Sequence, residues 1–349
     1  MSKIPSIKNE YLIKILVGLL NTPSPTGYTG MAIAYIEEAL ADFPALEVAW
    51  TKKGGLVAFW KGKSAASPRG LTAHTDTLGA MVKEIKCNGR LKLTQLGGYP
   101  WNTIEGEGCT VFASQGEPVR GSILIDAASV HVYGNDVAET KRDGDHIEVR
   151  LDARTTSQDE TEELGIAVGD FVAFDPRVEV TNGFVRSRHL DDKAGVACML
   201  GAIKALHEAD LKPVQDTIFH FSNYEEVGHG ASSGFPDDMG ELLAVDMAAV
   251  GRGQTSDEFN VTLCVKASGG PYHHGLNQRL RKLAQENDIP FKVDVYPHYG
   301  SDGEAYWRAG GDVAVALVGP GVDASHSYER THQDALFATT QWIIAYLLS

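Results

Sequence analysis

Two adjacent glutamates, Glu225 and Glu226, directly follow an apolar run in the segment "IFHFSNYEE". Like charges repel, and successive side chains of a strand point to opposite faces, so two carboxylates at this place need an explanation. Two solvated loop glutamates would be the simplest one. The alternative is a bound cation, whose charge offsets the repulsion while one glutamate binds it and the other acts as a general base.

Histidine and aspartate stand at the ends of four further apolar runs. "GLTAHTD" ends on His74 and Asp76, "FVRSRHLDD" on Asp191 and Asp192, "LLAVD" on Asp246, and "VALVGPGVDASH" on His326. Ligands gather at the carboxyl ends of strands in open α/β sheets, so the five strand ends together predict one shared pocket. One such residue alone would more often cap a helix or a turn.

The chemistry of this set is that of a hydrolytic metal site. Nitrogen and oxygen ligands without thiolates suit Zn²⁺ or Co²⁺, with Mn²⁺ as an alternative, and the number of carboxylates allows two ions bridged by one aspartate. We interpret Asp191 as the bridge and Asp192 as the cap of the following helix. Asp76, two residues after His74, suits a carboxylate that accepts the other ring N–H of a histidine ligand and fixes its tautomer.

Composition narrows the possible partners. The formal net charge of -15 and the pI near 5.2 argue against nucleic acid and against an anionic membrane surface. The four cysteines are far apart and form no CxxC pair, which favours a reducing compartment. Because we find neither an export signal nor an apolar run of membrane-spanning length, we expect a cytoplasmic protein.

Periodicity predicts an α/β fold with an insertion. Helix-spaced apolar residues at 10–20 and 30–41 precede short buried strands, and strands and helices alternate again after residue 178. Residues 78–177 instead contain short alternating strands separated by glycine turns, as in a small β-barrel or sandwich. We therefore expect a catalytic domain, a mixed sheet sandwiched by helices, from residues 1–77 and 178–349, with a β domain of residues 78–177 inserted in it.

The motifs resemble those of a known family. "AHTDTLGAMV", "RHLDDKAGV", "NYEEVGHGAS", "AVD", "GSDGEA" and "SHSYE" occur in the order and approximate spacing of the TET-type aminopeptidases, the glutamyl aminopeptidase-like group of dinuclear metallopeptidases in clan MH. The resemblance covers nearly the whole chain. It implies a phosphorylase- or hydrolase-like catalytic domain, a β domain for dimerisation, release of N-terminal residues from short peptides, and a homo-oligomer built from dimers, in many relatives a hollow dodecamer.

The resemblance also assigns roles to residues. One ion would be held by His74, Asp191 and Asp246, and the other by Asp191, Glu226 and His326. Glu225 would be the general base, and Asp76 would orient His74. Ser301 and Gly303 depart from the Thr and Ala that relatives often carry, and His229 and His332 are further departures, which leaves open the side chain that the S1 pocket accepts.

Other functions remain as alternatives. An N-deacylase or a carboxypeptidase-like hydrolase could use the same ions, and a metal-stabilised scaffold could bind them without turnover. A glycosidase would need two acids about 5 to 10 Å apart and would not use this set of His and Asp. The remaining histidines are expected to be structural or exposed, with His273, His274 and His298 as the ones that could reach substrate.

Overall fold

The computed structural model describes residues 4–349 and divides the chain into two compact units. One unit is formed by the chain up to Asp76 together with Arg177–Ser349, and the other by Thr77–Pro176. Each unit has a hydrophobic core of its own. No helix among residues 4–349 is both long enough and apolar enough to cross a membrane.

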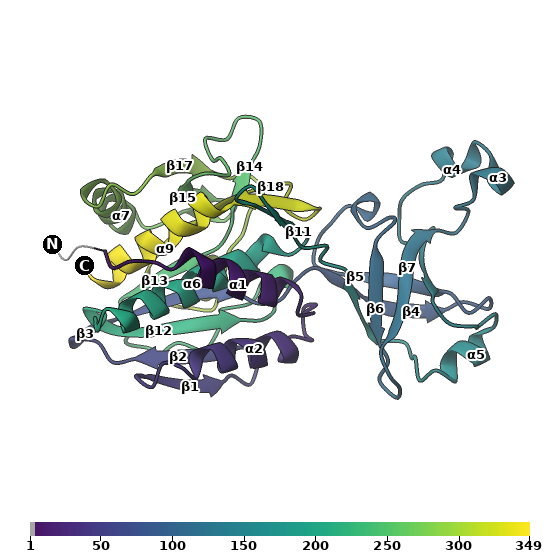
Figure 1. Cartoon of the computed structure of the whole chain (residues 1–349), viewed down its shortest axis with the longest axis horizontal. Helices are drawn as coiled ribbons and strands as arrows, with labels where there is room; N and C mark the ends of the chain where they lie inside the picture. Colours follow the sequence, from purple (N-terminus) through teal and green to yellow (C-terminus); the bar gives the residue numbers. More distant parts are fainter. Residues whose placement is uncertain (1–3) are drawn as a thin grey trace. The chain divides into compact units, whose positions relative to one another are not determined.

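The first unit is built on a 13-stranded mixed sheet (Figure 1). Its strands are β1 (Leu46–Trp50), β2 (Leu56–Trp60), β3 (Ser64–His74), β10 (Glu179–Thr181), β11 (Phe184–Ser187), β12 (Gln215–Ser222), β13 (Glu241–Val245), β14 (Ala248–Val250), β15 (Val261–Ala267), β16 (Gly270–Pro271), β17 (Phe291–Val295), β18 (Ala314–Asp323) and β19 (Glu329–His332). The main path runs β1-β2-β12-β3-β13-β18-β19-β11-β10, and its central strands β12, β3, β13 and β18 are parallel.

Helices cover both faces of this sheet. They are α1 (Asn9–Leu20), α2 (Gly30–Leu40), α6 (Leu190–Glu208), α7 (His274–Glu286), α8 (Asp302–Arg308) and α9 (Gln333–Leu347), with a 3-10 turn, η2, at Glu225–Val227. In Figure 1, α1, α6 and α9 lie together, and α6 contacts both of the others. This is the helix-covered mixed sheet that the sequence predicts.

Alternation along β13 separates the two faces. Leu243 and Val245 belong to the core that α6 and α9 complete, whereas Leu242 and Ala244 belong to a second cluster against which α8 packs its aromatic side chains. Successive side chains of a strand point to opposite faces, so a strand buried on both sides must be apolar throughout. The run "LLAVD" meets this demand through Val245, the last residue of β13, and the polar Asp246 follows directly after it.

The second unit is a closed six-stranded barrel. Its strands are β4 (Gly79–Ile85), β5 (Leu91–Leu96), β6 (Gly108–Phe112), β7 (Val119–Ile125), β8 (Ile147–Leu151) and β9 (Phe171–Phe174), in the order β4-β5-β8-β7-β6-β9. Pairing of β9 with β4 closes it. Four short helical elements lie in its connections: η1 (Trp101–Thr103), α3 (Val130–Tyr133), α4 (Asp136–Glu139) and α5 (Gln158–Glu162). The inserted β domain is thus a barrel rather than a sandwich.

Candidate metal and catalytic centre

The carboxyl ends of the parallel strands meet at one edge of the sheet. Ser222, the last residue of β12, pairs with His74, the last residue of β3, and Val245 at the end of β13 pairs with Val318 of β18. The polar residues that follow these strands therefore start from neighbouring positions, as the parallel arrangement requires. All seven residues predicted for the site lie in this region of the first unit.

A first group of possible ligands consists of His74, Asp191 and Asp246, all three buried. One ligand atom from each lies within 4.8 Å of the others. The His74 Nε2 atom is 3.0 Å from Asp191 Oδ1. One imidazole and two carboxylates in this arrangement form a set suited to a divalent metal ion.

A second group consists of Asp191, Glu226 and His326, and one ligand atom from each again lies within 4.8 Å of the others. The two groups share Asp191. His326 Nε2 lies 3.4 Å from Asp191 Oδ2 and 3.5 Å from Glu226 Oε2. The two oxygens of Asp191 therefore face different histidines. His326 is more open to solvent than the rest, with 36% of its side chain exposed.

Glu225 belongs to neither group but stands beside them. Its Oε2 atom is 3.7 Å from His74 Nε2, and 15% of its side chain is exposed. The strand has ended by this point: Tyr224 has a left-handed backbone with φ 75°, and η2 begins at Glu225. The two-face alternation of a strand therefore does not apply to the two glutamates.

Asp76 is completely buried, but its contacts differ from those expected. The Nδ1 atom of His74 is 2.8 Å from the main-chain carbonyl of Asp76 and 3.8 Å from its carboxylate, so the backbone rather than the side chain accepts the ring N–H. The carboxylate instead accepts hydrogen bonds from the Thr26 hydroxyl at 2.7 Å and from the main-chain N–H groups of Glu225 and Glu226 at 3.2 and 3.4 Å. Asp76 thus holds the backbone of the two glutamates.

Burial and mutual repulsion raise the proton affinity of three carboxylates of the site, those of Glu225, Glu226 and Asp246. Burial, followed by the charge of Asp191, raises the pKa of Glu226 to about 8 and the pKa of Asp246 to about 7. Burial also raises the pKa of Glu225 well above its ordinary value. A cation placed among these groups would favour their ionised forms.

Orphaned oxygen atoms provide a test of whether this chain could hold such a cation. Glu226 Oε1 and Asp246 Oδ1 are buried and have no hydrogen-bond partner within residues 4–349. Buried polar atoms are almost always satisfied, and a metal ion is one way of satisfying them. One of these atoms belongs to each group, so the donor set of each group fits a bound cation.

Asp192 behaves as the helix cap that the sequence predicts. Its Oδ1 atom accepts a hydrogen bond from Gly195 N at 3.1 Å, three residues further on, and its own backbone is not helical. Its Oδ2 atom accepts from the main-chain N–H of His74 at 3.3 Å. Asp192 therefore links the start of α6 to the end of β3.

Sequence reasoning missed Glu329, which supports both groups. This buried residue of β19 accepts hydrogen bonds from the main-chain N–H groups of Asp191 and His326, both at 3.0 Å. Its position three residues after His326 in "SHSYE" is the only signal in the sequence. Thr26 was missed as well, because nothing in "NTPSPTG" indicates that its hydroxyl reaches Asp76.

The other histidines have mostly structural contacts. His273 and His332 accept hydrogen bonds from N–H groups at the starts of α7 and α9. His274 and His298 are exposed, and the exposed ring of His229 stacks on Tyr224 with 5.2 Å between ring centroids. None of these five is among the residues that form the two ligand groups.

Comparison with known proteins places the chain in a family. A model of the M42 glutamyl aminopeptidases matches residues 54–341. The chain is 47% identical over 343 residues, 98% of each protein, to the Bacillus subtilis (strain 168) protein named "Putative aminopeptidase YhfE". It is 25% identical over 338 residues, 90% of each protein, to the lysyl aminopeptidase of Pyrococcus furiosus.

Solved structures share the fold. An aminopeptidase from Desulfurococcus kamchatkensis superposes with a TM-score of 0.86 at 21% identity, over 97% of this chain and 95% of that one. The TET1 peptidase of Pyrococcus horikoshii does so with a TM-score of 0.83 at 22% identity, over 97% and 99%. The M42 family is metal-dependent, in keeping with the two ligand groups. The chain belongs to the M42 glutamyl aminopeptidase family, and it is a peptide hydrolase.

Proposed function

We propose that this protein is a dinuclear metallo-aminopeptidase that removes N-terminal amino acids from short peptides. The observation that carries the proposal is the pair of ligand groups that share Asp191. Zn²⁺ or Co²⁺, or else Mn²⁺, suits their nitrogen and oxygen donors. The proposed ligands are His74, Asp191 and Asp246 for one ion and Asp191, Glu226 and His326 for the other.

Glu225 is the proposed general base. When bound, the two ions would activate the hydrolytic water and stabilise the negative charge that develops on the substrate carbonyl. Glu225 Oε2 takes a proton from that water while the water oxygen attacks the carbonyl carbon of the substrate. Glu225 later delivers the proton to the amide nitrogen when the C–N bond breaks. Burial raises the pKa of Glu225, and a carboxylate with a raised pKa is better able to hold the proton between the two transfers.

Asp76 has a positioning role in this proposal. Its carboxylate accepts hydrogen bonds from the main-chain N–H groups of Glu225 and Glu226, so it positions both the proposed base and one proposed ligand. Its main-chain carbonyl accepts the His74 ring N–H and leaves Nε2 free of a proton, as a metal ligand must be.

A panel of aminoacyl chromogenic substrates tests the activity. Protein stripped by a chelator should be inactive, and adding back Zn²⁺, Co²⁺ or Mn²⁺ should restore turnover. Substrates with an acetylated amine should not be cleaved, because an aminopeptidase requires the free N-terminus. Cleavage of the acetylated substrates but not of the free ones would favour a deacylase instead.

Two variants test the base. Glu225→Ala should abolish turnover while the bound metal is retained. The matched control is Glu241→Ala, since Glu241 lies at the opposite end of the sheet, at the start of β13, where it pairs with Arg69 and Arg279. That variant is expected to lose stability but to keep its turnover per folded molecule. Equal activity in the Glu225 variant and the wild type would refute the assignment.

We further propose a cytoplasmic homo-oligomer in which the barrel of residues 77–176 forms the dimer contact. The TET1 peptidase of Pyrococcus horikoshii, which shares the fold, can assemble into a tetrahedron or a large octahedral shell. The four cysteines are unpaired, which suits a reducing compartment. Light scattering of the full chain distinguishes a dimer from a dodecamer, and a monomer would contradict the proposal.

A further inference from the structure

The segment Tyr224–Ser232, here called the glutamate turn, has little regular structure of its own. It contains the single 3-10 turn Glu225–Val227 between two left-handed residues, Tyr224 and Gly228. Within the turn, Gly228 N donates to Glu225 O at 2.7 Å and His229 N donates to Tyr224 O at 3.1 Å. The position of the two glutamates therefore depends on groups outside the turn.

Asp302, at the start of α8, holds the turn from one side. It is 3% exposed, and its Oδ1 atom accepts a hydrogen bond from Ala231 N at 2.7 Å. Its Oδ2 atom accepts from the hydroxyls of Thr72 on β3 and Ser222 on β12, at 2.8 and 2.5 Å. A Cβ atom on Gly230 would lie 2.1 Å from Oδ1, so the turn passes as close to this carboxylate as a glycine permits. Asp302 thus ties the turn to the ends of both strands.

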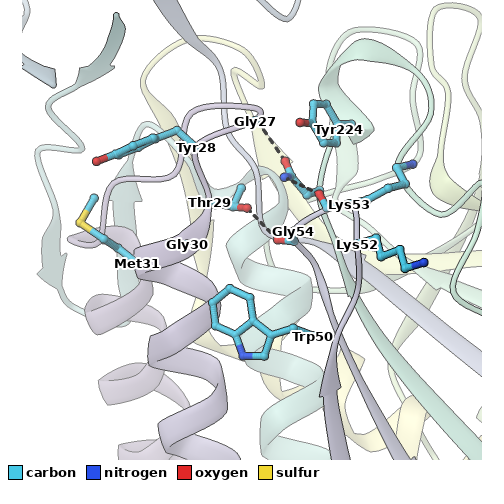
Figure 2. Close-up of a pocket in the computed structure, with 11 residues that line it drawn as sticks. Gly27, Tyr28, Thr29, Gly30, Met31, Trp50, Lys52, Lys53, Gly54 and Tyr224 are labelled. Carbon is cyan, nitrogen blue, oxygen red and sulfur yellow. Dashed lines mark hydrogen bonds between the residues drawn. The ribbon is translucent and has the colours of Figure 1, made fainter. Parts of the chain in front are cut away.

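Lys53, in the hairpin between β1 and β2, holds the same turn from another side. Its ammonium group donates to the carbonyls of His229 and Gly230, the latter at 2.8 Å, and to the Ser232 hydroxyl at 3.0 Å. Lys53 and Tyr224 line an open pocket with a volume of about 510 Å³. Figure 2 shows both side chains among the residues that line it. Because Lys53 lines a pocket and is only partly buried, replacing it leaves no cavity in the packed core.

We propose that Lys53 and Asp302 are positioning residues that set Glu225 and Glu226 in place through the glutamate turn. This inference rests on the proposed function, because it assumes that Glu225 is the base and Glu226 a ligand. Hydrogen bonds to ionised groups are shorter and stronger than neutral ones, so two charged residues can hold a turn that lacks regular structure. Groups that orient metal ligands typically change metal affinity or activity by about 10- to 100-fold when they are removed.

The test compares each positioning residue with a matched control. Lys53→Met removes the three donated hydrogen bonds, and Lys52→Met changes the neighbouring exposed lysine, which has no hydrogen bond or ion pair in the described chain. Asp302→Ala is compared with Asp294→Ala. Asp294 is a buried carboxylate that accepts from Thr255 N, Ser256 N and the Ser256 hydroxyl, none of which belongs to the ligand groups.

Metal binding is measured by competition with a chelator, and turnover by the kcat and KM of an aminoacyl substrate. In Lys53→Met and Asp302→Ala, one of the two metal-binding steps should weaken by about 10- to 100-fold while the other changes less than about twofold. The value of kcat should fall by a similar factor with KM nearly unchanged. Asp302→Asn, which keeps an acceptor for Ala231 N, should recover most of the lost affinity.

The controls decide between positioning and general destabilisation. The inference is wrong if the control variants Lys52→Met and Asp294→Ala weaken metal binding as much as Lys53→Met and Asp302→Ala do. It is also wrong if neither Lys53→Met nor Asp302→Ala weakens metal binding. Should Asp302→Ala fail to fold, Lys53→Met alone decides. A wild-type protein that binds two ions but cleaves no peptide would refute the proposed function, and the chelator titration would still test the positioning role.

Discussion

Replacing Asp191 by asparagine tests whether one side chain serves two metal ions. Its Oδ1 atom lies 3.0 Å from His74 Nε2 and its Oδ2 atom 3.4 Å from His326 Nε2, so each oxygen faces one ligand group. Asparagine keeps one oxygen, which is uncharged, and replaces the other with an NH₂ group that donates hydrogen bonds and cannot bind a cation. One group loses its shared ligand, and the other keeps a weaker one.

The size of the effect follows from linkage between binding and folding. A metal ion present at 100 times its dissociation constant stabilises the folded state by about 2.7 kcal/mol, so two ions bound at this excess give roughly 5 kcal/mol. At about 2 to 4 °C per kcal/mol for a domain of this size, the metal should raise the melting temperature of the wild type by on the order of 10 to 20 °C. Asp246→Asn and Glu226→Gln, each of which changes one group, should keep about half of that rise. Asp191→Asn should keep the least of the three.

The assay combines elemental analysis of reconstituted protein with thermal melts in the presence and absence of metal. We expect two ions per chain in the wild type, one in each single-group variant, and fewer than one in Asp191→Asn. Asp294→Asn controls for the loss of a buried carboxylate outside the site and should bind two. The shared-ligand reasoning fails if Asp191→Asn binds one ion as tightly as the wild type does. It also fails if Asp191→Asn loses no more of the metal-dependent rise in melting temperature than Asp246→Asn does.

Three further perturbations address the surroundings of the site. Thr26→Val removes the donor to the buried Asp76 carboxylate and should lower kcat by roughly 10-fold, because a hydrogen bond to a charged group is worth about 1.5 to 3 kcal/mol, whereas Thr26→Ser should retain wild-type kinetics. Burial lowers the pKa of His220 to about 4, so as the pH falls this histidine is protonated in the unfolded chain before it is protonated in the folded chain. Its contribution to the free energy of unfolding should therefore fall by about 3 kcal/mol between pH 6.5 and 4. In denaturant titrations, the loss of unfolding free energy over this pH range should be smaller in His220→Leu than in the wild type by about this amount. Gly319→Ala would place a Cβ 1.7 Å from the main-chain oxygen of Asp246. We expect chelator competition to show a lower metal affinity and calorimetry to show a lower melting temperature. If neither value changes, the close approach is contradicted.

The sequence predicts the elements and the residues at strand ends better than it predicts what holds them. The end of an apolar run is a local signal, so His74, Asp246 and the glutamate pair could each be found from a few neighbours. The contacts of Asp302 depend on α8 reaching two strands that lie 230 and 80 residues earlier in the chain, which no local pattern encodes. The closure of the barrel has the same origin, because it requires pairing between Met81 and Phe171.

The interaction of His74 with Asp76 shows a different limit. A spacing of two residues places a carboxylate near the histidine, and from spacing alone the side chain is the natural acceptor for the ring N–H. In the structure the main-chain carbonyl takes that role, and the carboxylate turns instead to Thr26 and to the N–H groups of the glutamates. A sequence pattern identifies which residues meet, but not which of their atoms make the contact.

The adjacency of Glu225 and Glu226 follows from the end of the strand. Within β12 the two side chains would point to opposite faces of the sheet, whereas the left-handed residue Tyr224 ends the strand and the 3-10 turn brings both to the same edge. Glu225 Oε2 then lies 3.7 Å from His74 Nε2, and Glu226 Oε2 lies 3.5 Å from His326 Nε2. Each glutamate faces a different histidine, so the two carboxylates can have different functions although they are neighbours in sequence. Inserting one residue between them should therefore abolish activity even if both carboxylates remain, since only one could keep its position relative to its histidine.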